Sequence, residues 1–254
     1  MKNINIYFEH NGQTKIGDQI ILTDLPENLY NAGFQVINKS NNPFLRHNPF
    51  VKNDGNNIRD LNFNDVNIYF LKNSHRVFSR SEALLNYLNV EGNITLTKPR
   101  FYIHENNKKE NIILIHTDGK QPLPDHIIEY IEFKYKENFR LIQIVHPGGR
   151  EFSCFEPMYF NFYNDEWENI AELASRSVMF IGVDSWVHHF VQAYISNVKV
   201  FFEYNFMKYL YRYGKNCYNL FDNSTEGNFW HHYNNFYFNE TEQPLYFSNP
   251  YTDI

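Results

Sequence analysis

The chain has 254 residues, which is enough for one large domain or for two small α/β halves. Hydrophobic residues make up 43% of it and the net charge is −6, so it can form a sizeable core but lacks the cation excess of non-specific nucleic-acid binders. Its two cysteines, Cys154 and Cys217, are too few for a disulfide framework or a zinc site. Neither a signal-peptide pattern nor an apolar run of the ~20 residues that span a bilayer is present. We therefore expect a cytoplasmic protein, with peripheral membrane contact left open.

The first half of the chain opens with a predicted strand, helix and strand. Residues 3–8 predict the first strand, and the apolar spacing over 21–32 predicts a helix that restarts at Asp24 and Pro26. Gly33 ends this helix before a strand at 34–37. The remaining predictions of this half are a loop over 38–65, a helix at 81–88, and strands at 66–71, 93–96 and 101–104.

The second half alternates strands and helices more regularly. Strands are predicted at 111–116, 140–145, 178–181 and 198–202, and helices at 124–136, 166–175, 185–196 and 207–213. This alternation favours an α/β fold with a doubly wound parallel sheet. The polar stretch 105–110 marks the expected boundary between a domain of residues 1–105 and a domain of residues 106–254, which ends in an aromatic, Asn-rich tail.

Ligands of parallel α/β sheets bind at the carboxyl ends of the strands, near helix starts. Four loops follow predicted strands in this way: 12–18, 117–120, 146–151 and 182–189. In the last of them a glycine, an acid and a hydroxyl, Gly182, Asp184 and Ser185, lead into a helix. Taken alone, Asp184 or Ser185 is an ordinary helix cap.

The whole segment 178–202 resembles the heptosyltransferase-like (ADP-heptose:lipopolysaccharide heptosyltransferase-related) glycosyltransferase family. That family has a strand, then Gly-x-Asp-Ser/Thr-Gly-Pro-x-His, a helix and a closing strand, and Gly182, Asp184, Ser185 and His189 match it in order. Trp186 and Val187 stand where the family has Gly-Pro, so the resemblance implies a divergent donor pocket.

Other landmarks of the family occur in the expected order. Ile113–His116 is similar to the strand that opens its nucleotide-binding domain, with Lys120 after it, and His146–Glu151 is similar to its Gly-rich Arg-Glu turn. Gly17 and Asp18 match the family's Gly-Asp opening. The resemblance implies a GT-B-type fold, with two Rossmann-like domains facing across a cleft and the first domain reduced.

The resemblance also implies an enzyme that moves a sugar from a nucleotide-sugar donor to a hydroxyl acceptor with inversion and without a metal or other cofactor. The donor would be bound by a set of residues in the second half: Lys120, Gly149, Arg150, Gly182, Asp184, Ser185 and His189. Asp18 would act as the base that deprotonates the acceptor. On the residues alone, Asp18 is equally a helix cap, and Lys120 and Arg150 are equally surface cations.

Several other functions remain open or are disfavoured. No Gly-x-x-x-x-Gly-Lys-Ser/Thr, Gly-x-Gly-x-x-Gly or Gly-x-Ser-x-Gly motif occurs, which disfavours P-loop kinases, dehydrogenases and α/β-hydrolases. The histidine pairs 188–189 and 231–232 are adjacent in sequence, a poor spacing for metal ligands. The alternatives are a nucleotide-sugar epimerase or hydrolase of the same fold, a non-catalytic sugar-binding or assembly protein, and a phage-type DNA-base glycosyltransferase. A saccharide or lipid-linked acceptor is expected from the family alone.

Overall fold

The computed structural model of the chain describes most residues up to 202 and one short strand beyond them. The described residues are 1–7, 16–65, 80–89, 98–105, 107–119, 122–160, 166–183, 185–202 and 217–219. They form two compact units that divide between Ile103 and His104. The strands predicted at 66–71 and 93–96 and the helix predicted at 207–213 lie outside the described residues.

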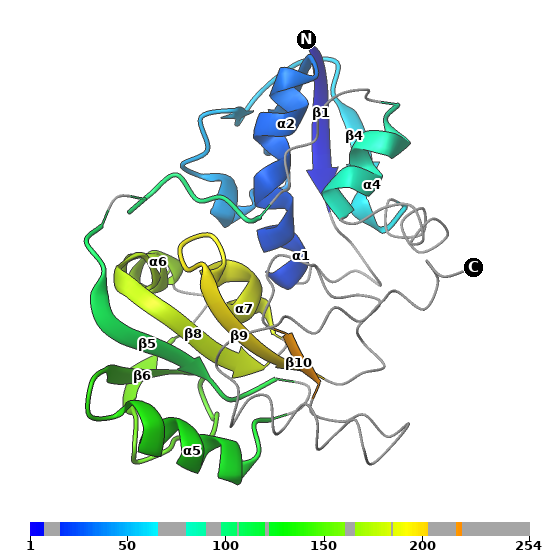
Figure 1. Ribbon diagram of the computed structural model, residues 1–254. Helices are drawn as coiled ribbons and strands as arrows, with labels where there is room; N and C mark the ends of the chain where they lie inside the picture. The colour runs from blue at the N-terminus through cyan, green and yellow to red at the C-terminus, as the bar shows by residue number, and fades with distance from the viewer. Residues whose placement is uncertain are drawn as a thin grey trace. The chain divides into compact units, whose positions relative to one another are not determined.

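The first unit contains a parallel sheet of four strands in the order β3-β2-β1-β4 (Figure 1). Pro26 lies in the first turn of α2, and Gly33 ends that helix at a φ of +85°, so the predicted β-α-β opening is confirmed. The elements of this unit are β1 (Lys2–Tyr7), α1 (Ile16–Ile21), η1 (Leu22–Asp24), α2 (Leu25–Asn31), β2 (Phe34–Ile37), η2 (Pro43–Leu45), β3 (Val51–Lys52), β4 (Arg59–Asn62) and α4 (Arg80–Tyr87).

Two predictions for this unit were wrong. The expected loop 38–65 contains β3 and β4, and β4 pairs along β1 from Ile4↔Arg59 to Tyr7↔Asn62. Only Leu61 in β4 is fully buried, so the strand lacks the apolar alternation that reveals strands in a sequence. The segment 101–104 is irregular instead of a strand, and His104 at its end adopts a left-handed φ of +54°.

The two faces of the first sheet are covered differently. Ile4 and Ile6 of β1 lie in one core with residues of α2 and α4, so both of these helices cover the same face. On the opposite face, Asn3 donates to the carbonyl of Asn56 (2.6 Å), and a Cβ on Gly55 would lie 2.9 Å from Cδ1 of Ile37. A loop therefore covers the sheet at this point, where a doubly wound fold places a helix.

The second unit contains a parallel sheet of six strands in the order β10-β9-β8-β5-β6-β7, so the predicted α/β fold with a parallel sheet is confirmed. Its elements are β5 (Glu110–His116), α5 (Asp125–Tyr135), β6 (Arg140–Val145), β7 (Glu156–Tyr159), α6 (Trp167–Arg176), β8 (Ser177–Val183), α7 (Trp186–Val191), β9 (Asn197–Phe202) and β10 (Cys217–Asn219).

Three elements of the second unit differ from expectation. β7 and β10 were not predicted, and the mostly exposed β7, with its Pro157, has the composition of an edge strand. The helix predicted over 185–196 ends at Val191, and the amide of Ala193 then bonds the carbonyl of Phe190 in a tighter turn (3.2 Å).

Helices cover both faces of the second sheet (Figure 1). Ile127 and Ile131 of α5 lie in one core with Ile113 and Ile115 of β5. α6 and α7 cover the other face, where the rings of Trp167 and Phe190 lie 6.2 Å apart. β5 is therefore buried on both faces, and its last residue lies in the middle of the sheet's carboxyl edge.

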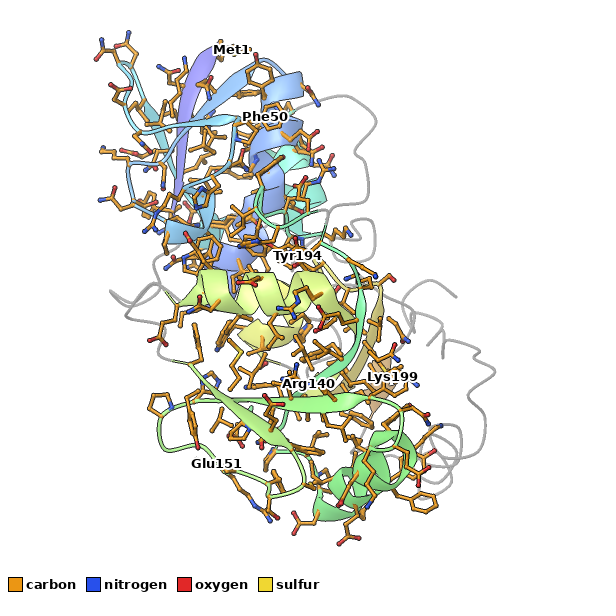
Figure 2. The ribbon with its side chains drawn as sticks, turned by 90° about the vertical axis from the view of Figure 1, so that its left-hand side faces the viewer. Met1, Phe50, Arg140, Glu151, Tyr194 and Lys199 are labelled. Carbon is orange, nitrogen blue, oxygen red and sulfur yellow. The ribbon has the colours of Figure 1, made fainter. Side chains whose placement is uncertain are left out.

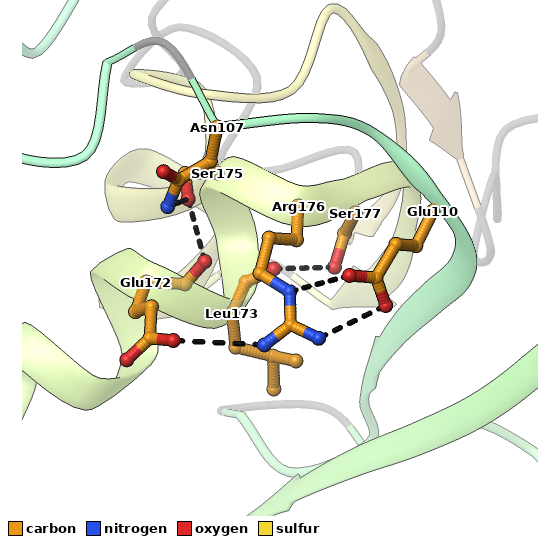
Figure 3. Close-up of polar contacts among 7 residues, drawn as sticks. All are labelled: Asn107, Glu110, Glu172, Leu173, Ser175, Arg176 and Ser177. Atoms are coloured by element: carbon orange, nitrogen blue, oxygen red, sulfur yellow. Dashed lines mark hydrogen bonds and ion pairs between the residues drawn. The ribbon is translucent and has the colours of Figure 1, made fainter.

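The amino end of β5 is fixed by ion pairs and hydrogen bonds (Figure 3). Arg176 makes a bidentate contact with Glu110 (2.7 and 3.0 Å), and Asn107 donates to Oγ of Ser175 (2.8 Å). Figure 2 labels Arg140 at the start of β6, where its guanidinium pairs with Glu156 of β7 (2.7 Å). These charged groups lie at the amino ends of the strands, whereas the candidate site lies at the carboxyl ends.

Candidate functional site at the carboxyl end of the second sheet

A chain of hydrogen bonds joins three loops at the carboxyl edge of the second sheet. His116 is the last residue of β5, His146 follows β6, and Ser185 precedes α7. Nε2 of His116 lies 3.0 Å from Nε2 of His146, and its Nδ1 lies 3.0 Å from Oγ of Ser185. The central imidazole therefore uses both ring nitrogens to connect the neighbouring loops.

Burial keeps the two imidazoles of this chain neutral. His116 is fully buried, and burial, followed by the nearby His146 and His188, lowers its pKa to about 3. Burial also lowers the pKa of the partly exposed His146, and the carboxylate of Asp118 opposes that shift. At neutral pH each contact in the chain thus holds a single proton, which lies on one or the other partner.

Ser185 is the N-cap of α7 and forms a capping box with His188. Its Oγ accepts from the amide of Val187 (3.2 Å), and its own amide donates to Nδ1 of His188 (3.1 Å). His188 is buried, and burial lowers its pKa to about 3, so it accepts this bond as a neutral imidazole. The position of the Ser185 hydroxyl is consequently fixed from the α7 side as well as by His116.

A buried glutamine connects the loops after β5 and β6. The side-chain amide of Gln143 donates to Oγ1 of Thr117 (2.9 Å) and to the carbonyl of Arg150 (2.8 Å). Its Oε1 accepts from the amide of Phe152 (3.1 Å). The amide of Arg150 also donates to Oδ2 of Asp118 (3.2 Å), so the two loops are held to one another at several points.

Two predicted glycines lie where a side chain does not fit. A Cβ on Gly182 would lie 2.8 Å from the carbonyl oxygen of His116 and 2.6 Å from Cζ of Phe180. A Cβ on Gly149 would lie 2.5 Å from Oδ2 of Asp118. Both glycines therefore allow the close approach of the loops that carry the histidines.

Trp186 forms an aromatic wall beside the histidines. Its half-exposed ring lies 5.7 Å from the ring of His146, 5.1 Å from that of Phe160 and 6.4 Å from that of Phe190. Phe160 and Phe190 are fully buried, so their contacts restrict the movement of the indole ring. An aromatic ring thus occupies the position for which the sequence resemblance implies Gly-Pro.

The structure brings together four of the predicted site residues: Gly149, Arg150, Gly182 and Ser185. The guanidinium of Arg150 pairs with Asp125 (2.8 Å) and lies over the ring of Phe152. His189 follows on α7, with its ring 3.7 Å from that of His188.

Three of the predicted site residues remain. Lys120 and Asp184 lie outside the described residues. Asp18 lies in the first turn of α1, in the other unit, and is half-buried there.

Sequence reasoning did not assign a role to His116, His146 or Gln143. A signal for the two histidines is present, because each follows an apolar run, Ile112–Ile115 and Ile144–Val145, at the end of a parallel strand. The burial of Gln143 within β6 has no such signal, since a polar residue in a strand normally indicates the solvent face.

The described residues offer neither a metal-binding cluster nor a membrane span. Among them, no three His, Cys, Asp or Glu side chains gather closely enough to hold an ion. None of their helices combines the length and the hydrophobicity needed to cross a bilayer.

Together the two parallel α/β units define the class of fold, which is that of GT-B-type glycosyltransferases. No protein-family model matches the sequence, and no curated protein matches it significantly. Solved structures, in contrast, are similar to this chain. A glycosyl transferase family 9 structure from Veillonella parvula DSM 2008 has a TM-score of 0.55 at 12% sequence identity, and the match covers 80% of this chain and 80% of that one.

A second similar structure is TibC from enterotoxigenic E. coli H10407, described as an iron-containing dodecameric glycosyltransferase. Its TM-score is 0.52 at 13% sequence identity. The match covers 78% of this chain and 57% of the TibC chain, so this chain spans little more than half the length of TibC. At these identities the likeness establishes a heptosyltransferase-like glycosyltransferase fold, and the chemistry has to be argued from the site.

Proposed function

We propose that this chain is a glycosyltransferase that moves a sugar from a nucleotide-diphosphate sugar to a hydroxyl acceptor, with inversion at the anomeric carbon and without a metal. One observation carries the proposal: Ser185, His116, His146 and the Gly149 turn converge at the carboxyl edge of the second sheet. This edge is where α/β folds bind nucleotides, and the fold is that of known glycosyltransferases.

The C-terminal domain, which we propose to comprise residues 106–254, would bind the donor. The leaving diphosphate gains charge as the glycosidic bond breaks, so donors of hydrogen bonds and cations around it stabilise the transition state. Ser185 supplies a hydroxyl at the site, and Lys120 follows β5 in the sequence at a position suited to a phosphate. We assign the hydroxyls of the donor sugar to Asp184, in line with the family resemblance.

Asp18 of the N-terminal domain, which we propose to comprise residues 1–105, would be the base that takes the acceptor proton. A carboxylate is suited to this step because the attacking hydroxyl loses its proton only as the new bond forms. We place this activity in the cytoplasm, on a saccharide or lipid-linked acceptor.

One observation favours a second candidate, a non-catalytic sugar-binding protein of the same fold. The ring of Trp186 rests on Phe160 and His146, where the family resemblance implies a small glycine and a proline for the donor diphosphate. A side chain of this size narrows the space for catalysis while it still offers a stacking surface for a sugar or a base.

The decisive experiment measures nucleotide binding and turnover with the full chain. Calorimetric titration with ADP, GDP and UDP would identify the nucleotide, and the matching nucleotide sugars would then be incubated with and without saccharide acceptors. Acceptor-dependent release of nucleoside diphosphate, with an inverted product by NMR, supports the transferase. Full-rate hydrolysis or epimerisation without acceptor contradicts it, as does the absence of binding at millimolar ligand.

Variants separate the proposed roles. Asp18→Asn should lower kcat with little change in the donor KM, whereas Lys120→Ala should raise the donor KM. The exposed residues Asp54 and Lys108 provide matched controls, and Asp54→Asn and Lys108→Ala should behave like the wild type. Binding of nucleotide sugars without any turnover, in wild type and variants alike, would select the non-catalytic candidate.

A further inference from the structure

The contacts of Ser185 leave its hydroxyl two distinct hydrogen-bonding states. A hydroxyl can donate one bond and accept two. Its Oγ already accepts from the amide of Val187 at 3.2 Å, and its second protein partner is Nδ1 of His116 at 3.0 Å. The direction of that second bond decides whether the hydroxyl proton is available to a ligand.

In the first state the proton of the hydroxyl points into the protein. Ser185 donates to Nδ1 of His116, the protonated Nε2 of His116 donates to Nε2 of His146, and His146 carries its proton on Nδ1. A ligand at Ser185 then meets an oxygen lone pair, which repels an anion.

In the second state each bond runs the other way. Nε2 of His146 donates to His116, Nδ1 of His116 donates to Ser185, and the hydroxyl proton is free to bond a ligand oxygen. Both states contain three protons. Their interconversion moves one proton across each of the two contacts, while Nδ1 of His146 releases a proton to solvent and the hydroxyl of Ser185 receives one from solvent. The second state also leaves Nδ1 of His146 with a lone pair.

A further proton can bind His146 only in the second state. In the first state Nε2 of His146 is the acceptor of the bond from His116, so a doubly protonated His146 would place two hydrogens in one 3.0 Å contact. Protonation of His146 and presentation of the Ser185 hydroxyl are therefore linked, and both favour a negatively charged ligand.

We propose that His116 and His146 are positioning residues that couple binding of an anionic diphosphate at Ser185 to uptake of one proton by His146. The inference rests on the proposed function, and it adds how the Ser185 hydroxyl is directed toward the donor. Proton uptake offsets part of the charge of the bound diphosphate in a chain whose own net charge is −6.

The charged groups around His146 are compatible with this coupling. From β5 and its loop it meets the neutral His116 and the carboxylate of Asp118, and from α7 it meets the uncharged ring of Trp186. His188 acts on His116 and is itself neutral because it is buried. Among these described neighbours Asp118 is the one carboxylate, and it favours the protonated form of His146.

The test uses the full chain and three probes, ADP-glucose, GDP-glucose and UDP-glucose, of which the tightest is taken forward. Their bridging diphosphates keep a constant charge over the pH range used, so a pH effect reports on the protein. The dissociation constant is expected to fall between pH 8.0 and pH 5.5, by about tenfold for each unit by which the ligand raises the pKa of His146. Calorimetry in two buffers of different ionisation enthalpy should show net proton uptake at pH 6.0.

Variants locate the proton. His146→Gln should abolish both the uptake and the pH dependence, whereas the matched control His126→Gln, on the exposed surface of α5, should retain them. Uptake that persists in His146→Gln overturns the inference. If that variant does not fold, side-chain ¹⁵N NMR of the wild-type complex decides: a proton on Nδ1 of His116 is expected, and a proton on its Nε2 overturns the coupling.

The outcomes also separate the two proposals. Binding without proton uptake or pH dependence overturns the inference and leaves the glycosyltransferase proposal intact. Failure of all three probes to bind at either pH, together with failure of the free nucleoside diphosphates, overturns the proposed function and the inference that rests on it.

Discussion

The side-chain amide of Gln143 donates to Oγ1 of Thr117 across 2.9 Å, inside the sheet of the second unit. The same amide donates to the carbonyl of Arg150, and its oxygen accepts from the amide of Phe152. One buried side chain of β6 thus satisfies three polar groups of the two loops that border the candidate site.

Gln143→Leu is expected to destabilise the protein by about 2–4 kcal/mol, because it leaves the buried hydroxyl of Thr117 and two partly buried backbone groups without these hydrogen bonds. Urea unfolding measures this change. Gln192 is a matched control, since it is also buried but its Oε1 has no hydrogen-bond partner among the described residues. An equal loss of stability in Gln192→Leu would show that the contacts of Gln143 contribute nothing specific.

Gly182→Ala tests the close approach of β8 and β5. The new Cβ would lie 2.8 Å from the carbonyl oxygen of His116, a backbone atom that cannot move without disturbing the sheet. We expect a loss of about 1–3 kcal/mol, as for other overpacked core positions, together with weaker nucleotide binding. Gly33→Ala is the control. Its φ of +85° strains the new side chain, but the new Cβ has open space around it. A loss of nucleotide binding that occurs only in Gly182→Ala is therefore due to displacement of His116 and not to backbone strain.

Ser185→Ala should weaken binding more than folding. Removal of the N-cap hydroxyl costs about 1 kcal/mol of stability, whereas a lost hydrogen bond to a charged phosphate costs about 1.5–3 kcal/mol of binding. Calorimetry with nucleotide sugars and thermal unfolding measure the two effects. Ser177→Ala, which removes the hydroxyl bonded to Leu173 at the amino end of β8, should leave the binding unchanged. Undiminished affinity in Ser185→Ala would exclude the hydroxyl from the donor site.

The buried histidines should make the protein sensitive to acid. The pKa values of His116 and His188 are about 3 in the folded protein and near 6.5 in the unfolded chain, so the unfolded state binds more protons between these limits. Stability is therefore retained above pH 6.5 and falls as the pH drops toward 3, by at most about 1.4 kcal/mol per pH unit for each histidine. Urea unfolding at pH 7.5, 6.0 and 5.0 measures the slope. His188→Gln should make the slope shallower, and the exposed control His126→Gln should not.

The sequence by itself determined the elements whose apolar patterns are strong. The run Ile112–Ile115 identified β5, the spacing of Ile127, Ile128 and Ile131 identified α5, and Gly33 marked the end of α2. These patterns reflect burial against a neighbouring layer, which is a local property of each segment. For the same reason the alternation of strands and helices predicted the parallel sheet, and with it the edge at which we expect ligands to bind.

Only the tertiary structure decided which side chains meet at that edge. β4 and β7 were missed because their pairing partners, and not their own apolar pattern, make them strands. Along the chain His116 is 30 residues from His146 and 69 residues from Ser185, and no local pattern encodes a contact over such a separation. The order of β8, β5 and β6 in the sheet places these three residues side by side, and burial there makes the imidazoles neutral.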